Sequence, residues 1–172
     1  NGTRDAMQGA YLGPAYAENT VLEILDAAGA HYDTLDDATL FNNVAKVLAD
    51  EKVVGWFQGR TEFGPRALGN RSILGDPRSG RMQRMLNLKI KYRESFRPFA
   101  PAVLREDVSE FFDLEGDSPY MLLVAQVKDK LHQDLSTEEV ALMGLDKLYA
   151  VRSTVPAITH VDYSARIQTV HE

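Results

Sequence analysis

Apolar side chains recur at helical spacing in two stretches near the start of the chain. In the first, residues 18–28, apolar positions repeat every three or four residues, and Gly29 follows as a C-terminal stop. In the second, residues 36–48, two adjacent aspartates offer an N-cap and the apolar positions share one face. We therefore expect two amphipathic helices. The glycine-containing residues 1–16 show little periodicity, which is typical of a linker.

Beyond residue 50, short apolar runs alternate with helix-start signals. The pattern predicts strands over 52–58, 71–75, 99–104, 120–127 and 149–170, and helices over 76–90, 107–112 and from 136 onward. The run KVVGWFQ is apolar enough to form a buried strand. The helix over 76–90 should bury Met82, Met85, Leu86 and Ile90. The alternation predicts an α/β fold with an open sheet.

Length and composition suit one domain with a hydrophobic core. The chain has 172 residues, 44% of them hydrophobic, and no cysteine. Disulfides and thiolate zinc sites are thereby excluded, and a reducing compartment fits. There is neither an apolar run of about 18 residues nor a basic-then-apolar N-terminus. We therefore expect a cytoplasmic protein without a membrane span, and the start at Asn1 points to a fragment.

Positive charge is concentrated in the middle third. Residues 51–105 carry 12 basic and 4 acidic side chains, whereas residues 1–50 carry 2 and 8, and residues 106–172 carry 5 and 13. Ten of the twelve central cations lie between Arg60 and Arg97. An acidic protein with its cations gathered in this way has a local positive field, which favours an anionic ligand.

The loop after the first predicted strand combines glycines with arginines. Glycine lets the backbone turn tightly and approach a ligand, and each arginine offers a planar fork for two phosphate or carboxylate oxygens. Its candidate binding residues are Arg60, Glu62, Arg66, Asn70, Arg71 and Ser72. The Gly-Lys-Ser/Thr ending of a P-loop is missing. Loops at strand ends often bind ligands in α/β proteins, but a surface loop with salt-bridged arginines is the competing interpretation.

A second basic stretch, residues 87–101, adds Lys91, Arg93 and Arg97 as candidates. Two prolines fix an extended segment there, which suits a rigid platform for arginine side chains. Cations near the end of a helix also serve its dipole, and this alternative stays open.

The third candidate stretch holds His160, Asp162 and Arg166. On a strand, His160 and Asp162 would share one face, although a lone His–Asp pair is more often structural. No second histidine stands at ligand spacing, and no serine is arranged with a base. We therefore expect neither a metal site nor a side-chain nucleophile in this chain.

Three runs carry a resemblance to a known family. They are GWFQGRTEFGPRALGNRSILGDPR, LKIKYRESFRPFAP and VPAITHVD with the following ARIQTV. Together they resemble the C-terminal domain of the carbamoyltransferases of nodulation-factor and antibiotic biosynthesis, over about residues 12–170. Tyr163 departs from the pattern, because glycine is expected at that position.

The resemblance implies a YrdC-like fold, which is a twisted, open, mixed sheet with helices packed on it around a positive cavity. It implies ATP with Mg²⁺ and carbamoyl phosphate as ligands, and carbamoyl adenylate as product. Lys91-Tyr-Arg93 is similar to a Lys-x-Arg signature that reaches phosphates. Arg60, Arg66 and Arg71 match the family's arginine-rich loop, and the third run adds His160 and Arg166 as candidates.

By the same resemblance, an iron-binding Kae1-like domain that carbamoylates a hydroxyl acceptor lies outside this chain. We expect residues 1–16 to be the linker from it. Residues 17–172 should form the YrdC-like domain, truncated before a Ser-Phe-Asn run that helps to bind nucleotide, so the chain need not be active alone. A non-catalytic scaffold domain and an RNA-binding module remain alternatives, although the aromatic residues are not interleaved with cations for base stacking.

Overall fold

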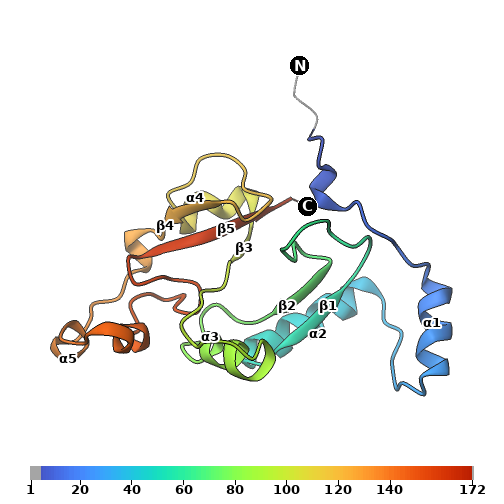
Figure 1. Cartoon of the computed structure of the whole chain (residues 1–172), viewed down its shortest axis with the longest axis horizontal. Coiled ribbons are helices and arrows are strands. Elements are labelled where there is room, and N and C mark those ends of the chain that lie inside the picture. The colour runs from blue at the N-terminus through green and yellow to red at the C-terminus, as the bar shows by residue number, and fades with distance from the viewer. Residues whose placement is uncertain (1–4, 172) are drawn as a thin grey trace. The chain divides into compact units, whose positions relative to one another are not determined.

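The computed structural model describes residues 5–171 and divides into two compact units, Asn1–Leu74 and Gly75–Glu172 (Figure 1). Each unit contains an open sheet with helices, which confirms the predicted α/β class. The YrdC-like likeness and the predicted domain boundary after residue 16 stay predictions. No helix within residues 5–171 is both long and apolar enough to cross a membrane.

The first unit contains two helices and a β-hairpin. Its elements are a 3₁₀ turn (Gln8–Ala10), α1 (Glu18–Ala27), α2 (Asp37–Ala49), β1 (Val54–Phe57) and β2 (Arg71–Leu74). Both helices occur where the apolar spacing predicts them. The predicted N-cap is confirmed at Asp36, whose carboxylate accepts the Thr39 N–H at 2.9 Å. Phe41 of α2 lies 6.3 Å from Trp56 of β1, ring centre to ring centre.

The prediction of a buried first strand is wrong. β1 pairs antiparallel with β2 alone, from Val54 opposite Leu74 to Phe57 opposite Arg71. Alternate residues of β1 are half-buried and exposed, and Phe57 is 60% exposed. A two-stranded hairpin shields only one face, so the apolar run KVVGWFQ cannot be covered on both sides.

Part of the predicted linker is hydrogen-bonded to the hairpin loop. The Gly13 N–H donates to the Thr61 carbonyl at 2.9 Å, and the Thr61 N–H donates to the Pro14 carbonyl at 2.9 Å. The Phe63 N–H reaches the Ala10 carbonyl at 2.6 Å. Residues 10–14 thus form a strap along one side of the loop.

The second unit is built on a three-stranded mixed sheet, with short helices and turns around it. Its helices are α3 (Met82–Met85), a π-helical turn (Leu86–Ile90), α4 (Val108–Phe111) and α5 (Thr137–Val140), with 3₁₀ turns at Arg105–Asp107, Asp129–Leu131 and Gly144–Tyr149. Its strands are β3 (Ala102–Leu104), β4 (Leu123–Gln126) and β5 (Ser164–Val170). β5 lies in the middle, parallel to β3 and antiparallel to β4 (Figure 1). Phe112, Ile158 and Ile167 lie in the buried core of this unit.

Two predictions in this unit need correction. The helix expected over 76–90 begins only at Met82, because the Asp76 carboxylate closes a turn by accepting the Arg78 N–H at 2.9 Å. Met82 and Leu86 are buried as expected, but Ile90 is exposed after the π-helical turn changes the helix phase. The strand expected over 149–170 is limited to Ser164–Val170.

Candidate functional site

The hairpin loop of the first unit is organised around the carboxylate of Glu62. One oxygen, Oε1, accepts the backbone N–H groups of Asn70 at 2.7 Å, Leu68 at 2.8 Å and Arg71 at 3.2 Å. Glu62 is only 9% exposed. The burial alone would raise the pKa of the carboxyl group, but the backbone hydrogen bonds outweigh it and hold the pKa below its usual value. The charge of Glu62 therefore orders the loop.

Asn70 closes the base of the same loop. Its Nδ2 donates to the Arg60 carbonyl at 2.7 Å, and its Oδ1 accepts from Gln58 Nε2 at 3.3 Å. Gly59 lies against this amide with a φ of +51°, and an added Cβ would lie 3.3 Å from Nδ2. Only glycine adopts such a conformation readily in so close a contact.

The guanidinium of Arg71 is bound to the loop's own backbone. Its Nη1 donates to the carbonyls of Gln58 and Asn70, the latter at 2.7 Å, and its Nη2 donates to the Gly59 carbonyl at 3.1 Å. Its Cζ lies 3.5 Å from the centre of the Phe57 ring. This arrangement makes Arg71 a brace between the two ends of the loop.

Arg60 and Arg66 are the loop cations that the backbone does not engage. Within the described residues, the exposed Arg60 side chain has no hydrogen-bond or ion-pair partner. Arg66 is half-buried, and its Nε is hidden from solvent without a hydrogen-bond partner among these residues. The Ser72 hydroxyl accepts the Gly69 N–H at 3.1 Å and so supports the loop.

The second basic stretch folds around Asn87, a fully buried residue of the π-helical turn. The Asn87 Nδ2 donates to the Ser95 carbonyl at 3.1 Å and to the Arg97 carbonyl at 2.8 Å. Its Oδ1 accepts the Arg93 Nε–H at 2.7 Å. A single side chain therefore fixes both the backbone of this loop and one of its cations.

Arg93 is held in place by two contacts that leave its Nη nitrogens without a hydrogen bond inside the described part of the chain. Its Nε is bound to Asn87, and its Cζ lies 5.0 Å from the centre of the Phe99 ring. Among residues 5–171, no partner contacts its two Nη nitrogens. Those two nitrogens can grip two oxygens of one phosphate, which is the geometry that arginine favours.

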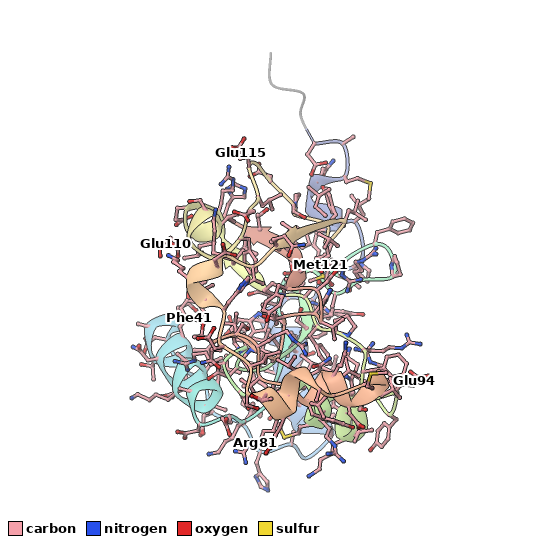
Figure 2. The ribbon with its side chains drawn as sticks, turned by 90° about the vertical axis from the view of Figure 1, so that its left-hand side faces the viewer. Phe41, Arg81, Glu94, Glu110, Glu115 and Met121 are labelled. Atoms are coloured by element: carbon pink, nitrogen blue, oxygen red, sulfur yellow. The ribbon has the colours of Figure 1, made fainter. Side chains whose placement is uncertain are left out.

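Lys91 and Arg97 flank this position. Lys91 is exposed, and within the described part of the chain no carboxylate pairs with its Nζ. Arg97 donates through Nε to Glu94 at 3.0 Å, and both side chains are more than half exposed (Figure 2 labels Glu94). Such an exposed pair contributes little to stability and leaves the Arg97 fork free to change partners.

His160 and Asp162 meet through a third residue. The predicted strand is absent here, because residues 160–163 form a turn in which the Tyr163 N–H donates to the His160 carbonyl at 3.0 Å. The Ser164 hydroxyl donates to Asp162 Oδ1 at 2.7 Å and lies 3.0 Å from His160 Nδ1. Since the single hydroxyl proton goes to Asp162, Nδ1 must be the donor to Ser164, and Nε2 then carries the lone pair.

Tyr163, where the family pattern expects glycine, has a φ of +61°. This left-handed conformation is the one that glycine adopts without strain. The His132 ring lies 4.2 Å from the Tyr163 ring, centre to centre, and this contact helps to hold the turn. Arg166 is half-buried on β5. Burial, and to a smaller extent the charge of Arg166, lowers the pKa of His160.

Comparison with known proteins assigns the chain to a family. Residues 45–172 match the family described as Carbamoyltransferase C-terminus. The chain belongs to this family. This confirms the resemblance carried by the arginine-rich loop and the Lys91–Arg93 run.

Three relatives illustrate this carbamoyltransferase membership. An uncharacterized protein of Synechocystis is 58% identical over 97% of this chain. Nodulation protein NolO of Bradyrhizobium diazoefficiens is 39% identical over 97% of the chain, and 3′-hydroxymethylcephem-O-carbamoyltransferase of Streptomyces clavuligerus is 39% identical over 79%. The chain spans only 28%, 28% and 21% of these proteins, respectively.

The candidate residues of this carbamoyltransferase domain fall into two units. Arg60, Glu62, Arg66, Asn70, Arg71 and Ser72 share the hairpin loop, whereas Lys91, Arg93, Arg97, His160 and Arg166 belong to the second unit. Sequence reasoning missed Asn87, although a buried-face asparagine next to a cationic run was a usable signal. It also passed over Ser164, which links His160 to Asp162.

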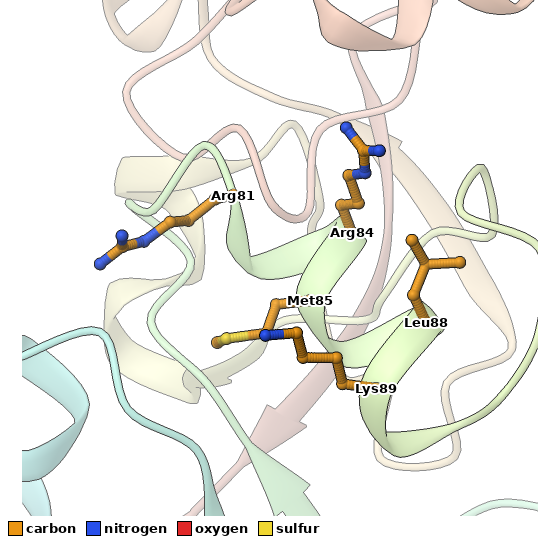
Figure 3. A pocket seen from close by; sticks show the side chains of 5 residues that line it. All are labelled: Arg81, Arg84, Met85, Leu88 and Lys89. Carbon is orange, nitrogen blue, oxygen red and sulfur yellow. The ribbon is translucent and has the colours of Figure 1, made fainter.

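A further group of cations surrounds an open hollow of about 420 Å³ on the second unit (Figure 3). Arg81, Arg84 and Lys89 line it together with the apolar side chains of Met85 and Leu88. Figure 3 shows Lys89 extending to the side of Met85, while Arg81 extends in the same general direction but lies apart from both. Arg84 extends elsewhere, with its Cζ 5.9 Å from the centre of the Tyr149 ring. These cations were not among the predicted site residues.

Proposed function

We propose that this carbamoyltransferase domain binds carbamoyl phosphate and ATP and forms carbamoyl adenylate. The carbamoyl group would then pass to a hydroxyl acceptor in another domain of a larger cytoplasmic enzyme. The observation that carries the proposal is Arg93, a cation that is held through its Nε–H and the Phe99 ring and whose Nη nitrogens form no hydrogen bond within residues 5–171. Family membership supports the carbamoyl chemistry, and the relative named 3′-hydroxymethylcephem-O-carbamoyltransferase supports it further.

The chemistry requires charge neutralisation rather than a protein nucleophile. Water first releases phosphate from carbamoyl phosphate, and an oxygen of the resulting carbamate attacks the α-phosphorus of ATP while pyrophosphate leaves. Both reactants are anions that repel each other. Arginine forks and a lysine that are already in position offset this repulsion and align the attack. Mg²⁺ would accompany the nucleotide and neutralise phosphate charge, held mainly by the phosphates.

The residues divide into supporting and binding groups under this proposal. Glu62, Asn70, Arg71 and Ser72 support the hairpin loop, since their polar atoms bind its backbone. Arg60 and Arg66 are its ligand-binding cations. Lys91, Arg93 and Arg97 would bind phosphate from the second unit, with His160 and Arg166 as additional ligand contacts.

The test is isothermal titration calorimetry with carbamoyl phosphate and with a non-hydrolysable ATP analogue. We expect Arg93→Ala and Lys91→Ala each to weaken binding by roughly 10- to 100-fold, the value of one charge-assisted contact. Arg105→Ala is the matched control, because that arginine already pairs with Asp117 at 2.6 Å. Failure of the unmodified protein to bind either ligand, or equal binding by all variants, would overturn the proposal.

A non-catalytic scaffold role gives a different result. In that case the arginines would contact an acidic neighbouring domain, and the protein would bind neither carbamoyl phosphate nor ATP. This domain and its Arg60→Ala variant can each be titrated with the remaining part of a full-length relative. Binding that the substitution weakens would indicate the scaffold role.

A further inference from the structure

Asn87 and Arg93 are joined twice, once through the backbone and once through their side chains. The Arg93 backbone N–H donates to the Asn87 carbonyl at 3.0 Å, and the Arg93 Nε–H donates to Asn87 Oδ1 at 2.7 Å. Asn87 is 0% exposed. The contact is therefore partly shielded from water, and such a bond is stronger there than at the surface.

The asparagine amide has no spare donor for a phosphate ligand. Both donors of Nδ2 are used by the carbonyls of Ser95 and Arg97, and Oδ1 is used by Arg93. The π-helical turn that contains Asn87 is closed by the Lys91 N–H, which donates to the Leu86 carbonyl at 2.9 Å. π-Turns are rare and frequently lie at functional sites.

We propose that Asn87 is the positioning residue of the phosphate-binding site: it fixes the orientation of the Arg93 fork and does not touch the ligand itself. This inference rests on the proposed function, because it assigns a role to Arg93 in binding carbamoyl phosphate. With Nε held by Asn87, the guanidinium can rotate little about its long axis. The two Nη nitrogens then contact a phosphate in one orientation. The Arg93 side chain loses less conformational entropy on binding than an arginine without this hydrogen bond would lose.

Asparagine suits this position better than the residues closest to it in size. Aspartate keeps an acceptor for Arg93 Nε but lacks the two donors for the Ser95 and Arg97 carbonyls. Leucine fills a similar volume and offers neither donor nor acceptor. Asn87→Asp therefore removes the support of the loop backbone but keeps the contact with Arg93, whereas Asn87→Leu removes both.

A double-mutant cycle tests the proposal with carbamoyl phosphate as the titrated ligand. We expect Asn87→Leu to weaken binding about tenfold, since the fork loses its fixed orientation. The Arg93→Lys side chain has no Nε, so in that background Asn87→Leu should weaken binding no further. Additive losses would mean that Asn87 acts through overall folding and would overturn the inference.

Gln83 provides a matched control in the same loop. Its Nε2 donates to the Arg97 carbonyl at 3.2 Å and to the Phe96 carbonyl at 3.4 Å, but it does not contact Arg93. Gln83→Leu therefore removes support of the loop backbone alone. We expect its effect on binding to be small, and to be the same in the unmodified protein and in the Arg93→Lys background.

A spectroscopic measurement keeps the test decisive if Asn87→Leu does not fold. In ¹⁵N-arginine-labelled protein, the Arg93 Nε–H resonance, assigned by its loss in Arg93→Lys, should exchange slowly with water. Asn87→Asp should retain this slow exchange. Fast exchange in the unmodified protein contradicts the inference, whereas a slowly exchanging resonance with no binding of carbamoyl phosphate contradicts the proposed function on which it rests.

Discussion

The carboxylate of Glu62 accepts the backbone N–H of Asn70 at 2.7 Å, eight residues further along the chain. The same oxygen also accepts the N–H groups of Leu68 and Arg71. An acidic side chain thus lies inside an arginine-rich loop, and its carboxylate binds backbone N–H groups rather than an arginine side chain. The arrangement converts a flexible connection between two strands into a loop with a defined shape.

Replacing this carboxylate should weaken the loop. Glu62→Gln keeps the acceptor oxygen but removes its negative charge from three hydrogen bonds, and it replaces the second carboxylate oxygen by an NH₂ group. We expect the free energy of unfolding to fall by about 1–3 kcal/mol, measured by urea denaturation. Glu115→Gln, at an exposed position (Figure 2), is the control and should change stability by less than about 0.5 kcal/mol. Equal stability of the two variants would contradict the anchor role.

Arg71 and Arg60 should respond differently to the same substitution. Lysine cannot reproduce the fork by which Arg71 binds the carbonyls of Asn70 and Gly59, nor its contact with the Phe57 ring. We expect Arg71→Lys to lower the melting temperature by several degrees, consistent with a loss of about 1–2 kcal/mol. Arg60→Lys should leave the melting temperature unchanged, and a comparable shift in both would refute the brace assignment.

The short connection between Gly13 and Thr61 predicts a steric effect. A Cβ at position 13 would lie 2.8 Å from both the Thr61 Cβ and the Thr61 carbonyl oxygen. We expect Gly13→Ala to displace the strap and cost about 1–3 kcal/mol. Gly55→Ala is the control, since nothing lies within 4 Å of the added methyl group. The melting temperatures of the two variants, measured by thermal unfolding, test this prediction. Equal melting temperatures would exclude close packing of the strap against Thr61.

His160 should be neutral and protonated at Nδ1 in the folded protein at pH 7. Burial lowers its pKa below the ordinary value of 6.5, although the neighbouring Asp162 acts in the opposite direction. As the pH falls through 6.5, the unfolded chain binds a proton there before the folded protein does, so the free energy of unfolding decreases. The stability that neutral His160 provides is therefore fully present above pH 6.5 and is lost as the pH falls below that value.

Two measurements check the state of His160. Long-range ¹H–¹⁵N NMR should show the Nδ1–H tautomer, and His160→Gln should flatten the pH dependence of stability between about pH 5 and 7. Glu62 and Asp162 do not interfere in this window, because their lowered pKa values place their own losses of stability in the acid range, below pH 4.5. An Nε2–H tautomer in the folded protein would contradict the Asp162–Ser164–His160 arrangement.

Local signals in the sequence were sufficient for several elements. The cap at Asp36, the apolar spacing of α1 and α2, and the helix start at residue 136 depend on residues close together in the sequence, and all three occur as expected. The α/β class also followed from the alternation of patterns. The extent of the last strand did not, because residues 149–163 form mainly turns and irregular structure, in which Ala157 and Ile158 are buried but Val151 and Val161 are exposed.

The candidate site was predictable by residue type but not by role. Arginines and glycines indicated an anion-binding loop, yet the sequence could not distinguish Arg71, which binds backbone carbonyls, from Arg93, whose fork is open. That distinction depends on which acceptor atoms the folded loop brings within hydrogen-bonding distance of each guanidinium. Asn87 escaped notice for the same reason, since its amide acts on residues six to ten positions away.

The most direct test of phosphate binding by the Arg93 fork is ³¹P NMR of carbamoyl phosphate during titration with the protein. We expect a concentration-dependent shift or broadening of the phosphate line with the unmodified protein and with Arg105→Ala. Arg93→Ala should abolish most of this change at the same concentrations. An identical response from the unmodified protein and Arg93→Ala would show that Arg93 does not bind the phosphate group.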